Sequence, residues 1–139
     1  MKSTVLTLAL LLIIIENVLS CTIEIMVKSD SRKPVYAQYT APDGQKSPLW
    51  LFKKINQNQR FNIVLETCAK APMIVDLFEV KPDGEPGAKI DSTSAIVNGN
   101  GFVDYVITDD HHARMARRVG VLCGFGACGT RGKRSTVFY

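Results

Sequence analysis

The sequence lacks the signatures of several protein classes. It contains no Gly-x-Ser-x-Gly stretch, which would mark the nucleophile of an α/β-hydrolase, and no Asn-x-Ser/Thr acceptor for N-linked glycans. It also has no internal repeat, low-complexity tract or interdomain linker. The apolar run over residues 5–15 stops before Glu16 and is shorter than the roughly 20 residues of a membrane-spanning helix. These absences leave a single modest domain.

The N-terminal residues have the pattern of a cleavable export signal. Lys2 precedes the apolar run, and the small residues Val18 and Ser20 stand just ahead of Cys21. We therefore predict a signal peptide over residues 1–20 and a secreted, extracellular mature protein without a transmembrane segment. The alternative is a bacterial lipid-anchoring signal, which also places a cysteine at the new N-terminus and would take Cys21 out of disulfide pairing.

The chain has only four cysteines, and in an exported chain this number indicates two disulfides. Four cysteines permit three pairings. Cys21 opens the first expected strand and Cys68 follows the end of another; if these strands are antiparallel neighbours, the two residues come within bridging distance. We expect Cys21–Cys68 and, across a glycine-rich turn, Cys123–Cys128. In the alternative pairing, Cys123 ties its own segment to the sheet.

Apolar residues upstream of Thr108 mostly recur at every second position, which is the period of a half-buried strand. In the first such segment Ile23, Ile25 and Val27 share one face. In the second, either the set that contains Val35 or the alternate set points inward. The expected strands cover residues 22–29, 34–40, 60–67, 73–80, 93–97 and 101–108.

Turn chemistry separates these strands. Pro-Asp-Gly occurs at residues 42–44 and 82–84, where proline presets its φ and glycine accepts a positive φ. The Asn-Gly-Asn-Gly stretch at 98–101 lies between two alternating segments and predicts a hairpin. Strands at this spacing indicate an antiparallel sandwich.

After the last strand the pattern becomes helical. Thr108 or Asp109 can act as an N-cap, acidic residues fill the first turn, arginines fill the last, and Gly120 closes the segment. We predict a helix of two to three turns, with His111, Met115 and Val119 on one stripe. The predicted fold class is all-β: a small antiparallel β-sandwich over residues 21–129, stapled by disulfides, with one short C-terminal helix.

The charge of the mature chain is unevenly distributed. Residues 21–108 carry ten basic and ten acidic residues, whereas residues 109–139 carry six and two, so the net +4 comes from the last part. Arg114, Arg117 and Arg118 are our candidate polyanion-binding residues; the competing interpretation is a solvated helix face. The expected partner is an unknown extracellular protein, a glycan or an anionic membrane surface. Nucleic acid is not expected.

The C-terminal tail, residues 130–139, offers a second candidate function. Arg131, Lys133 and Arg134 form an Arg-x-Lys-Arg pattern of the kind cut by secretory proprotein convertases. A cut after Arg134 would make the chain a precursor of a hormone-like or defensive product. The competing interpretation is a flexible basic tail, because chain termini are commonly poorly held.

Acidic residues and imidazoles gather near residue 110 and raise the question of a metal. Asp104, Asp109 and Asp110 could supply calcium ligands, but capping already explains two of them. His111 and His112 are consecutive, so on a helix they would diverge rather than converge on zinc. With no arrangement of nucleophile, base and orienting group, we expect no metal, no cofactor, no catalytic residue and no enzymatic activity.

The single tryptophan, Trp50, is followed by Leu51 and Phe52 and then by Lys53 and Lys54. An apolar group with a basic rim suits an interaction or membrane-surface patch. A tryptophan that fills the core of a small sandwich is the favoured interpretation, because one large aromatic side chain commonly dominates such a core.

The order of segments resembles that of small exported proteins of nematode type. The resemblance rests on CTIEIMVKS after the signal, APDGQKS, a mid-chain cysteine, NGNGFVDYVITDD and RRVGVLCGFGACG. It implies secretion and an all-β core, and it assigns no functional residue. Together these patterns predict a secreted, disulfide-stabilised β-sandwich that acts as an extracellular binding or interaction module toward anionic surfaces.

Overall fold

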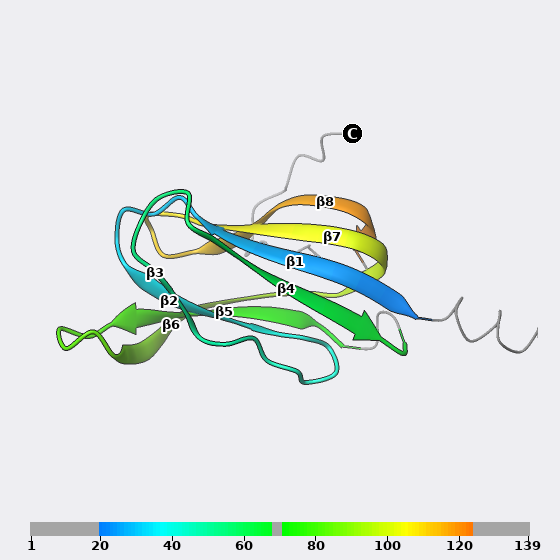
Figure 1. The fold of residues 1–139 in the computed structure, drawn as a ribbon, viewed down its shortest axis with the longest axis horizontal. Helices are drawn as coiled ribbons and strands as arrows, with labels where there is room; N and C mark the ends of the chain where they lie inside the picture. Colours follow the sequence, from blue (N-terminus) through cyan, green and yellow to red (C-terminus); the bar gives the residue numbers. More distant parts are fainter. Residues whose placement is uncertain (1–19, 68–70, 124–139) are drawn as a thin grey trace, which may run out of the picture.

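The structure is a computed structural model that describes residues 20–67 and 71–123. Within those ranges the chain forms strands and turns, and no helix long and apolar enough to cross a membrane occurs in them. The strands follow the chain as shown in Figure 1: β1 (Cys21–Ser29), β2 (Val35–Thr40), β3 (Trp50–Phe52), β4 (Asn58–Leu65), β5 (Met73–Val80), β6 (Pro86–Ala95), β7 (Val97–Ile107) and β8 (Ala113–Cys123).

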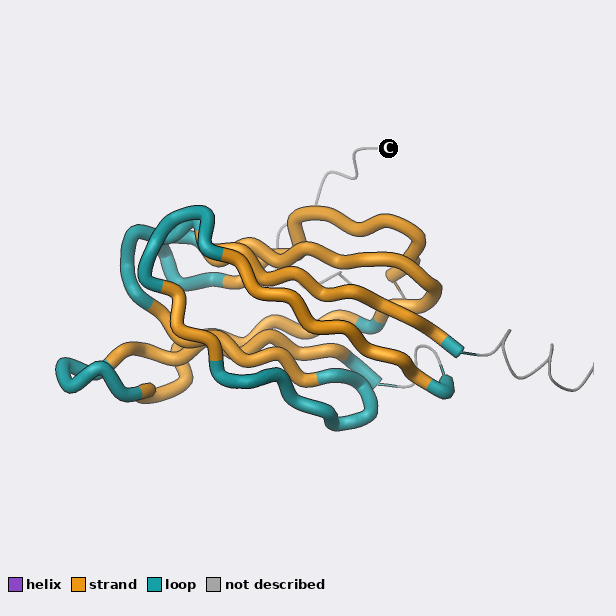
Figure 2. Tube along the Cα trace, in the orientation of Figure 1, coloured by secondary structure: helices purple, strands orange, loops and turns teal. Residues whose placement is uncertain are grey.

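The strands form two four-stranded sheets packed face to face. Sheet A has the order β4-β1-β7-β8 and sheet B the order β3-β2-β5-β6. Neighbouring strands are antiparallel except β1 and β7, which are parallel. Figures 1 and 2 show the two layers, with loops gathered at the two ends of the strands. The predicted all-β sandwich is confirmed at this level, with one parallel pair inside it.

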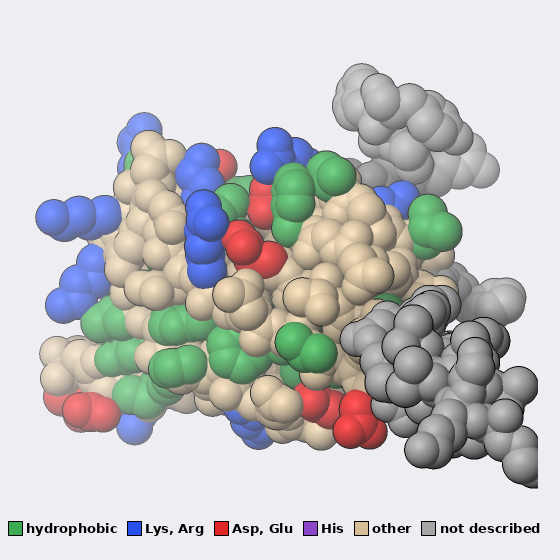
Figure 3. Space-filling view, turned by 45° about the vertical axis from the view of Figure 1, so that its right-hand side comes forward, with side chains coloured by type: hydrophobic (Ala, Val, Ile, Leu, Met, Phe, Trp, Pro, Cys, Tyr) green, Lys and Arg blue, Asp and Glu red, His purple; other side chains and the backbone are tan. Residues whose placement is uncertain are grey.

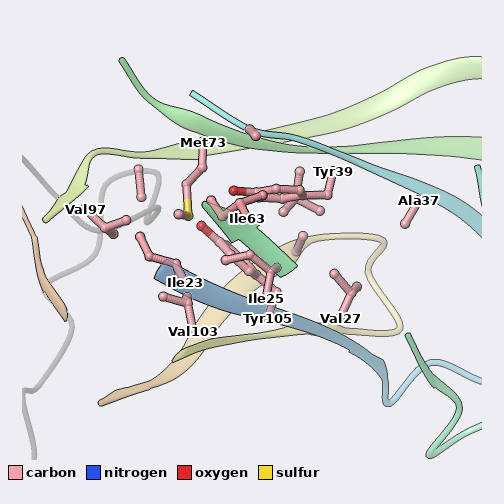
Figure 4. Packing of buried hydrophobic residues seen from close by; sticks show 14 of the residues in the cluster. Ile23, Ile25, Val27, Ala37, Tyr39, Ile63, Met73, Val97, Val103 and Tyr105 are labelled. Carbon is pink, nitrogen blue, oxygen red and sulfur yellow. The ribbon is translucent and has the colours of Figure 1, made fainter. Parts of the chain in front are cut away.

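Alternation along β1 and β2 builds the core between the sheets. In β1 the side chains of Ile23, Ile25 and Val27 are fully buried, as predicted. In β2 it is the set of Val35, Ala37 and Tyr39 that points inward. Figure 4 shows Ile23 and Ile25 of β1 and Tyr39 of β2 in the space between the two sheets. Trp50 is only 9% exposed and belongs to the same core, so its favoured interpretation is confirmed.

The condition on which the expected Cys21–Cys68 bridge rests is met, because β1 and β4 are antiparallel neighbours and Cys21 faces Leu65. Cys68 and Cys128 lie outside the described residues. Cys21 and Cys123 are the two cysteines of the described residues, and neither is a free thiol. The export signal and the basic residues Arg131, Lys133 and Arg134 also lie outside the described ranges.

The hairpin expected at residues 98–101 was a wrong prediction. These residues belong to β7, which runs without a turn from Val97 to Ile107. They form a bulge, where the register with β8 shifts between Gly99 and Phe102. Glycines with positive φ are suited to a bulge as well as to a tight turn, so the Asn-Gly-Asn-Gly sequence is compatible with both structures.

The helix expected over residues 108–120 was also wrong, because β8 begins at Ala113. Residues 108–112 form the β7–β8 turn. The Thr108 amide donates to the His112 carbonyl at 3.0 Å, and the His111 amide donates to the Thr108 carbonyl at 2.9 Å. The Pro-Asp-Gly turns at 41–45 and 81–85 have the same pair of hydrogen bonds. His111, with φ of 58°, takes the position that glycine holds in those two turns.

Candidate functional site

The three candidate arginines all lie on β8, and the structure does not bring them into one patch. Arg117 Nε is 3.1 Å from Asp104 Oδ2, and its guanidinium lies 4.7 Å from the centre of the Phe102 ring. Both partners are on the outer face of sheet A. Arg118 is half-buried and lies against Cys123, because its cross-strand neighbour is the inward-facing Val103. Only two of the three arginines therefore face the same side.

The second outward arginine also has a carboxylate partner. Arg114 Nη2 is 3.1 Å from Asp110 Oδ2, which lies on the turn that precedes it. Figure 3 shows the result on the upper part of the molecule, where basic, acidic and apolar side chains are interleaved. An anionic ligand at this face would compete with carboxylates already in place. Polyanion binding by Arg114, Arg117 and Arg118 stays a prediction.

A different basic surface is built by loops at one end of the sandwich. The loop over residues 30–34 joins β1 to β2, the loop over 53–57 joins β3 to β4, and the turn over 108–112 joins β7 to β8. Main-chain hydrogen bonds hold them together. The Ser29 amide donates to the Gln57 carbonyl at 2.8 Å, and the Asp30 amide donates to the Ile107 carbonyl at 2.9 Å.

These loops carry a cluster of exposed basic side chains without carboxylate partners. Arg32, Lys33, Lys53 and Lys54 are exposed, and no guanidinium or ammonium nitrogen of the four lies within 4.0 Å of a carboxylate oxygen of the described residues. Ile55, next to the two lysines, is 44% exposed. Blue side chains project from this end of the molecule, at the left of Figure 3. We call these five residues the basic end.

The loop that presents Lys53, Lys54 and Ile55 is held from within. The Lys53 amide donates to Gln57 Oε1 at 2.9 Å, and Gln57 Nε2 donates to the Leu51 carbonyl at 2.9 Å. Asn56 adopts a φ of 66°, a conformation that asparagine tolerates better than most residues, and its amide donates to Ser29. The tip is thus fixed against the rest of the sandwich.

Asp109 and Asp110 lie at the rim of the basic end. The Arg32 amide donates to Asp109 Oδ1 at 2.7 Å, and this hydrogen bond is the main cause that lowers the pKa of Asp109. The Ser31 hydroxyl and the charges of Arg32 and Lys33 act in the same direction, while burial opposes them. The pKa of Asp110 is lowered chiefly by a hydrogen bond from Thr108. Both groups are therefore carboxylates at neutral pH.

These shifts predict how the loops respond to acid. A carboxyl whose pKa is lowered in the folded state adds stability above its usual pKa of 3.8, and this contribution is lost as the pH falls through the folded value. We expect the carboxyl carbons of Asp109 and Asp110 to titrate below 3.8 in a carbon-13 NMR titration. In Asp109→Asn, the acid-induced shift of the Arg32 amide resonance should disappear. Titration at or above the usual value would contradict this expectation.

Asp91 and His112 link the two sheets. Asp91, on β6, is buried and accepts from the Ala113 amide at 3.3 Å, and its Oδ2 lies 3.2 Å from His112 Nδ1. The Thr93 hydroxyl donates to the Ala113 carbonyl at 2.7 Å. These contacts tie sheet B to the start of β8. Asp104 pairs with Arg117 and Asp110 with Arg114, whereas Asp109 accepts from the Arg32 amide, and the described residues include no group of three or more His, Cys, Asp or Glu side chains placed to hold a metal.

Comparison with known proteins gives little beyond the geometry. No protein family matches the sequence, and no curated protein matches it significantly. Among solved structures, the crystal structure of the human-specific toxin intermedilysin aligns over 73% of this chain and 24% of that chain, with 12% sequence identity and a TM-score of 0.30. The chain thus spans about a quarter of that protein's length. A likeness at this level says nothing about the activity of this chain.

Proposed function

We propose that the chain is a secreted β-sandwich binding module that attaches to anionic membrane surfaces through the basic end. The observation that carries the proposal is the set of four exposed basic side chains on the same joined loops as the exposed Ile55, none of whose charged nitrogens lies within 4.0 Å of a carboxylate oxygen of the described residues. The proposed contact surface is therefore the basic end and not the arginines of β8.

The chemistry of the basic end suits a bilayer. Each lysine or arginine close to an anionic membrane contributes about 1 kcal/mol of attraction, and an apolar tip gains further by entering the headgroup region. The loops are tied to each other by main-chain hydrogen bonds, so little ordering is needed on binding. Cys21 and Cys123 lie at the far ends of β1 and β8, which leaves the basic end facing away from the points where the described chain begins and ends.

Two disulfides are part of this proposal. Support comes from the β1–β4 register, which sets Cys21 opposite Leu65, three positions before Cys68, and from the absence of a free thiol among the described cysteines. Each bridge would contribute about 2–4 kcal/mol to so small a domain. Intact mass of the secreted protein after thiol alkylation counts the bridges and also reports removal of residues 1–20.

Vesicle binding tests the proposed surface. In Lys53→Gln/Lys54→Gln, we expect binding to vesicles that contain phosphatidylserine to weaken roughly 30-fold at low salt, because about 2 kcal/mol of attraction is removed. Binding should also fall steeply with added salt, since exposed charges are screened. The affinity is measured by vesicle co-sedimentation, or from the signal of a fluorescent label attached far from the basic end.

The matched control is Lys46→Gln/Lys89→Gln, which removes the same charge from the β2–β3 loop and from the outer face of sheet B. It should lower the affinity by no more than about 2-fold, as expected for a distant charge beyond the screening length. Ile55→Ser should weaken vesicle binding about 5-fold but leave retention on heparin unchanged. Equal losses in the two lysine pairs, or a loss confined to Arg114→Gln/Arg117→Gln, would overturn the proposal.

A further inference from the structure

Two buried tyrosines, one from each sheet, meet inside the sandwich. Tyr39 comes from β2 in sheet B and Tyr105 from β7 in sheet A, and both side chains have no exposed surface. Neither phenolic oxygen has a hydrogen-bond partner. Figure 4 shows the two side chains reaching toward each other, with Met73 beside them. Two polar atoms are therefore enclosed together in an otherwise apolar core.

The two hydroxyls are electrostatically close. Burial raises the pKa of both phenols, and the charge of Tyr105 is a further cause that raises the pKa of Tyr39. Such coupling requires that the phenolic oxygens share the same poorly screened region. Their neighbours Ile23, Ile63 and Met73 are also fully buried, and of these only the thioether sulfur can accept, weakly.

An orphaned buried hydroxyl carries a large penalty. A hydroxyl that loses its hydrogen bonds to water and gains none in the protein costs about 1–3 kcal/mol. Phenylalanine would fill the same space at either position without that penalty. A tyrosine hydroxyl can both donate and accept, so a single small molecule with both capacities satisfies two of them together. Water is the smallest such molecule, and buried waters usually sit between otherwise unpaired polar groups.

We propose that Tyr39 and Tyr105 form an internal water-binding site, in which one water molecule is hydrogen-bonded to both phenolic oxygens. The water accepts from one hydroxyl and donates to the other. The site thereby joins β7 of sheet A to β2 of sheet B through polar contacts inside the core, apart from the link that Asp91 of β6 makes with β8. It does not depend on the membrane-binding proposal.

Magnetic relaxation dispersion of water oxygen-17 and deuterium tests this site, because it counts long-lived internal waters in solution. Comparison of the wild type with Tyr39→Phe/Tyr105→Phe should show the loss of one long-lived water molecule per protein. The matched control is Tyr36→Phe, because the Tyr36 hydroxyl donates to the Gly84 carbonyl at 2.7 Å on the surface. The control should leave the dispersion unchanged. An unchanged dispersion in the double variant would overturn the proposal.

Stability of the single variants separates the remaining arrangements. If a water bridges the hydroxyls, Tyr39→Phe and Tyr105→Phe should each lower the folding equilibrium constant about 2- to 10-fold, and the double variant should lower it by less than the product. If the hydroxyls are simply orphaned, each substitution raises the constant. If they bond directly to each other, the singles lose stability while the dispersion does not change. Either of these last two results contradicts the water site.

Discussion

Replacement of Gly120 by alanine is expected to destabilise the domain by about 3–5 kcal/mol, a large part of the free energy of unfolding of a domain this small. Gly120 has a φ of 75°, which side chains other than glycine rarely adopt. An added Cβ would also lie 2.1 Å from the Asn100 carbonyl oxygen and 3.2 Å from Gly101 Cα. Both obstacles are main-chain atoms of the paired strand β7, so they can move only if the β7–β8 bulge opens.

Gly44 provides the matched control for this variant. Its φ of 89° is equally unusual, but an added Cβ would meet nothing within 4 Å. Gly44→Ala should therefore cost only the conformational part, about 1–2 kcal/mol. Urea unfolding of the three proteins, followed by circular dichroism, measures both free energies. Equal costs would show that the close approach between β7 and β8 is not a constraint in solution.

Ile25→Ala is expected to cost about 2–5 kcal/mol in the free energy of unfolding. Ile25 lies in the middle of β1, which is flanked in sheet A by β4 and β7, and its side chain is fully buried between the sheets. Truncation there removes apolar contacts and leaves space that the surrounding strands cannot easily fill. The change should appear as a lower urea midpoint with an unaltered slope.

Met26→Ala tests the register of the same strand. Met26 is the next residue along β1, is half-exposed and faces the outside of sheet A. Its truncation should cost less than about 1 kcal/mol, because little buried volume is lost. Shifting a strand by one residue exchanges its two faces. A larger loss for Met26 than for Ile25 would therefore show that β1 has the opposite orientation.

Much of the sandwich could be predicted because its local signals agree with its tertiary contacts. In β1, the apolar residues that alternate in the sequence are the ones whose side chains are buried in the core. The two Pro-Asp-Gly segments form turns because proline and glycine favour the required φ angles wherever they lie. The short strand β3 was not predicted, since three residues around Trp50 are too few for a period to be visible.

A helix was expected where β8 forms because the pairing of β8 with β7 contains two bulges. Residue 116 is an extra residue between the pairs Tyr105–Met115 and Asp104–Arg117, and a second register shift follows near Gly120. Each bulge changes which face the next residue occupies, so apolar residues no longer alternate and Met115 and Val119 fall at helical spacing. Thr and Asp begin turns by the same side-chain hydrogen bonds with which they cap helices.

The basic end could be predicted only in part. The sequence shows Lys53 and Lys54 as a basic rim beside Trp50, but it does not show which other basic residues lie near them. Arg32 and Lys33 lie some twenty positions away in sequence, and only the hydrogen bonds from the Ser29 segment to residues 56–57 bring the two loops to the same place. In the sequence, helix capping accounts for Asp110, the partner of Arg114, and only the β7–β8 register brings Asp104 beside Arg117, so net charge alone does not reveal that these arginines are paired.

The parallel pairing of β1 with β7 has a consequence for how the protein reaches its native state. It joins segments from opposite ends of the domain, as in the bond from the Thr22 amide to Asn100 across 78 positions. Contacts of such long loop length form late and slow folding to the millisecond-to-second range typical of β-sandwiches. During synthesis, the edge of β1 that pairs with β7 therefore stays open until residues 97–107 have been made.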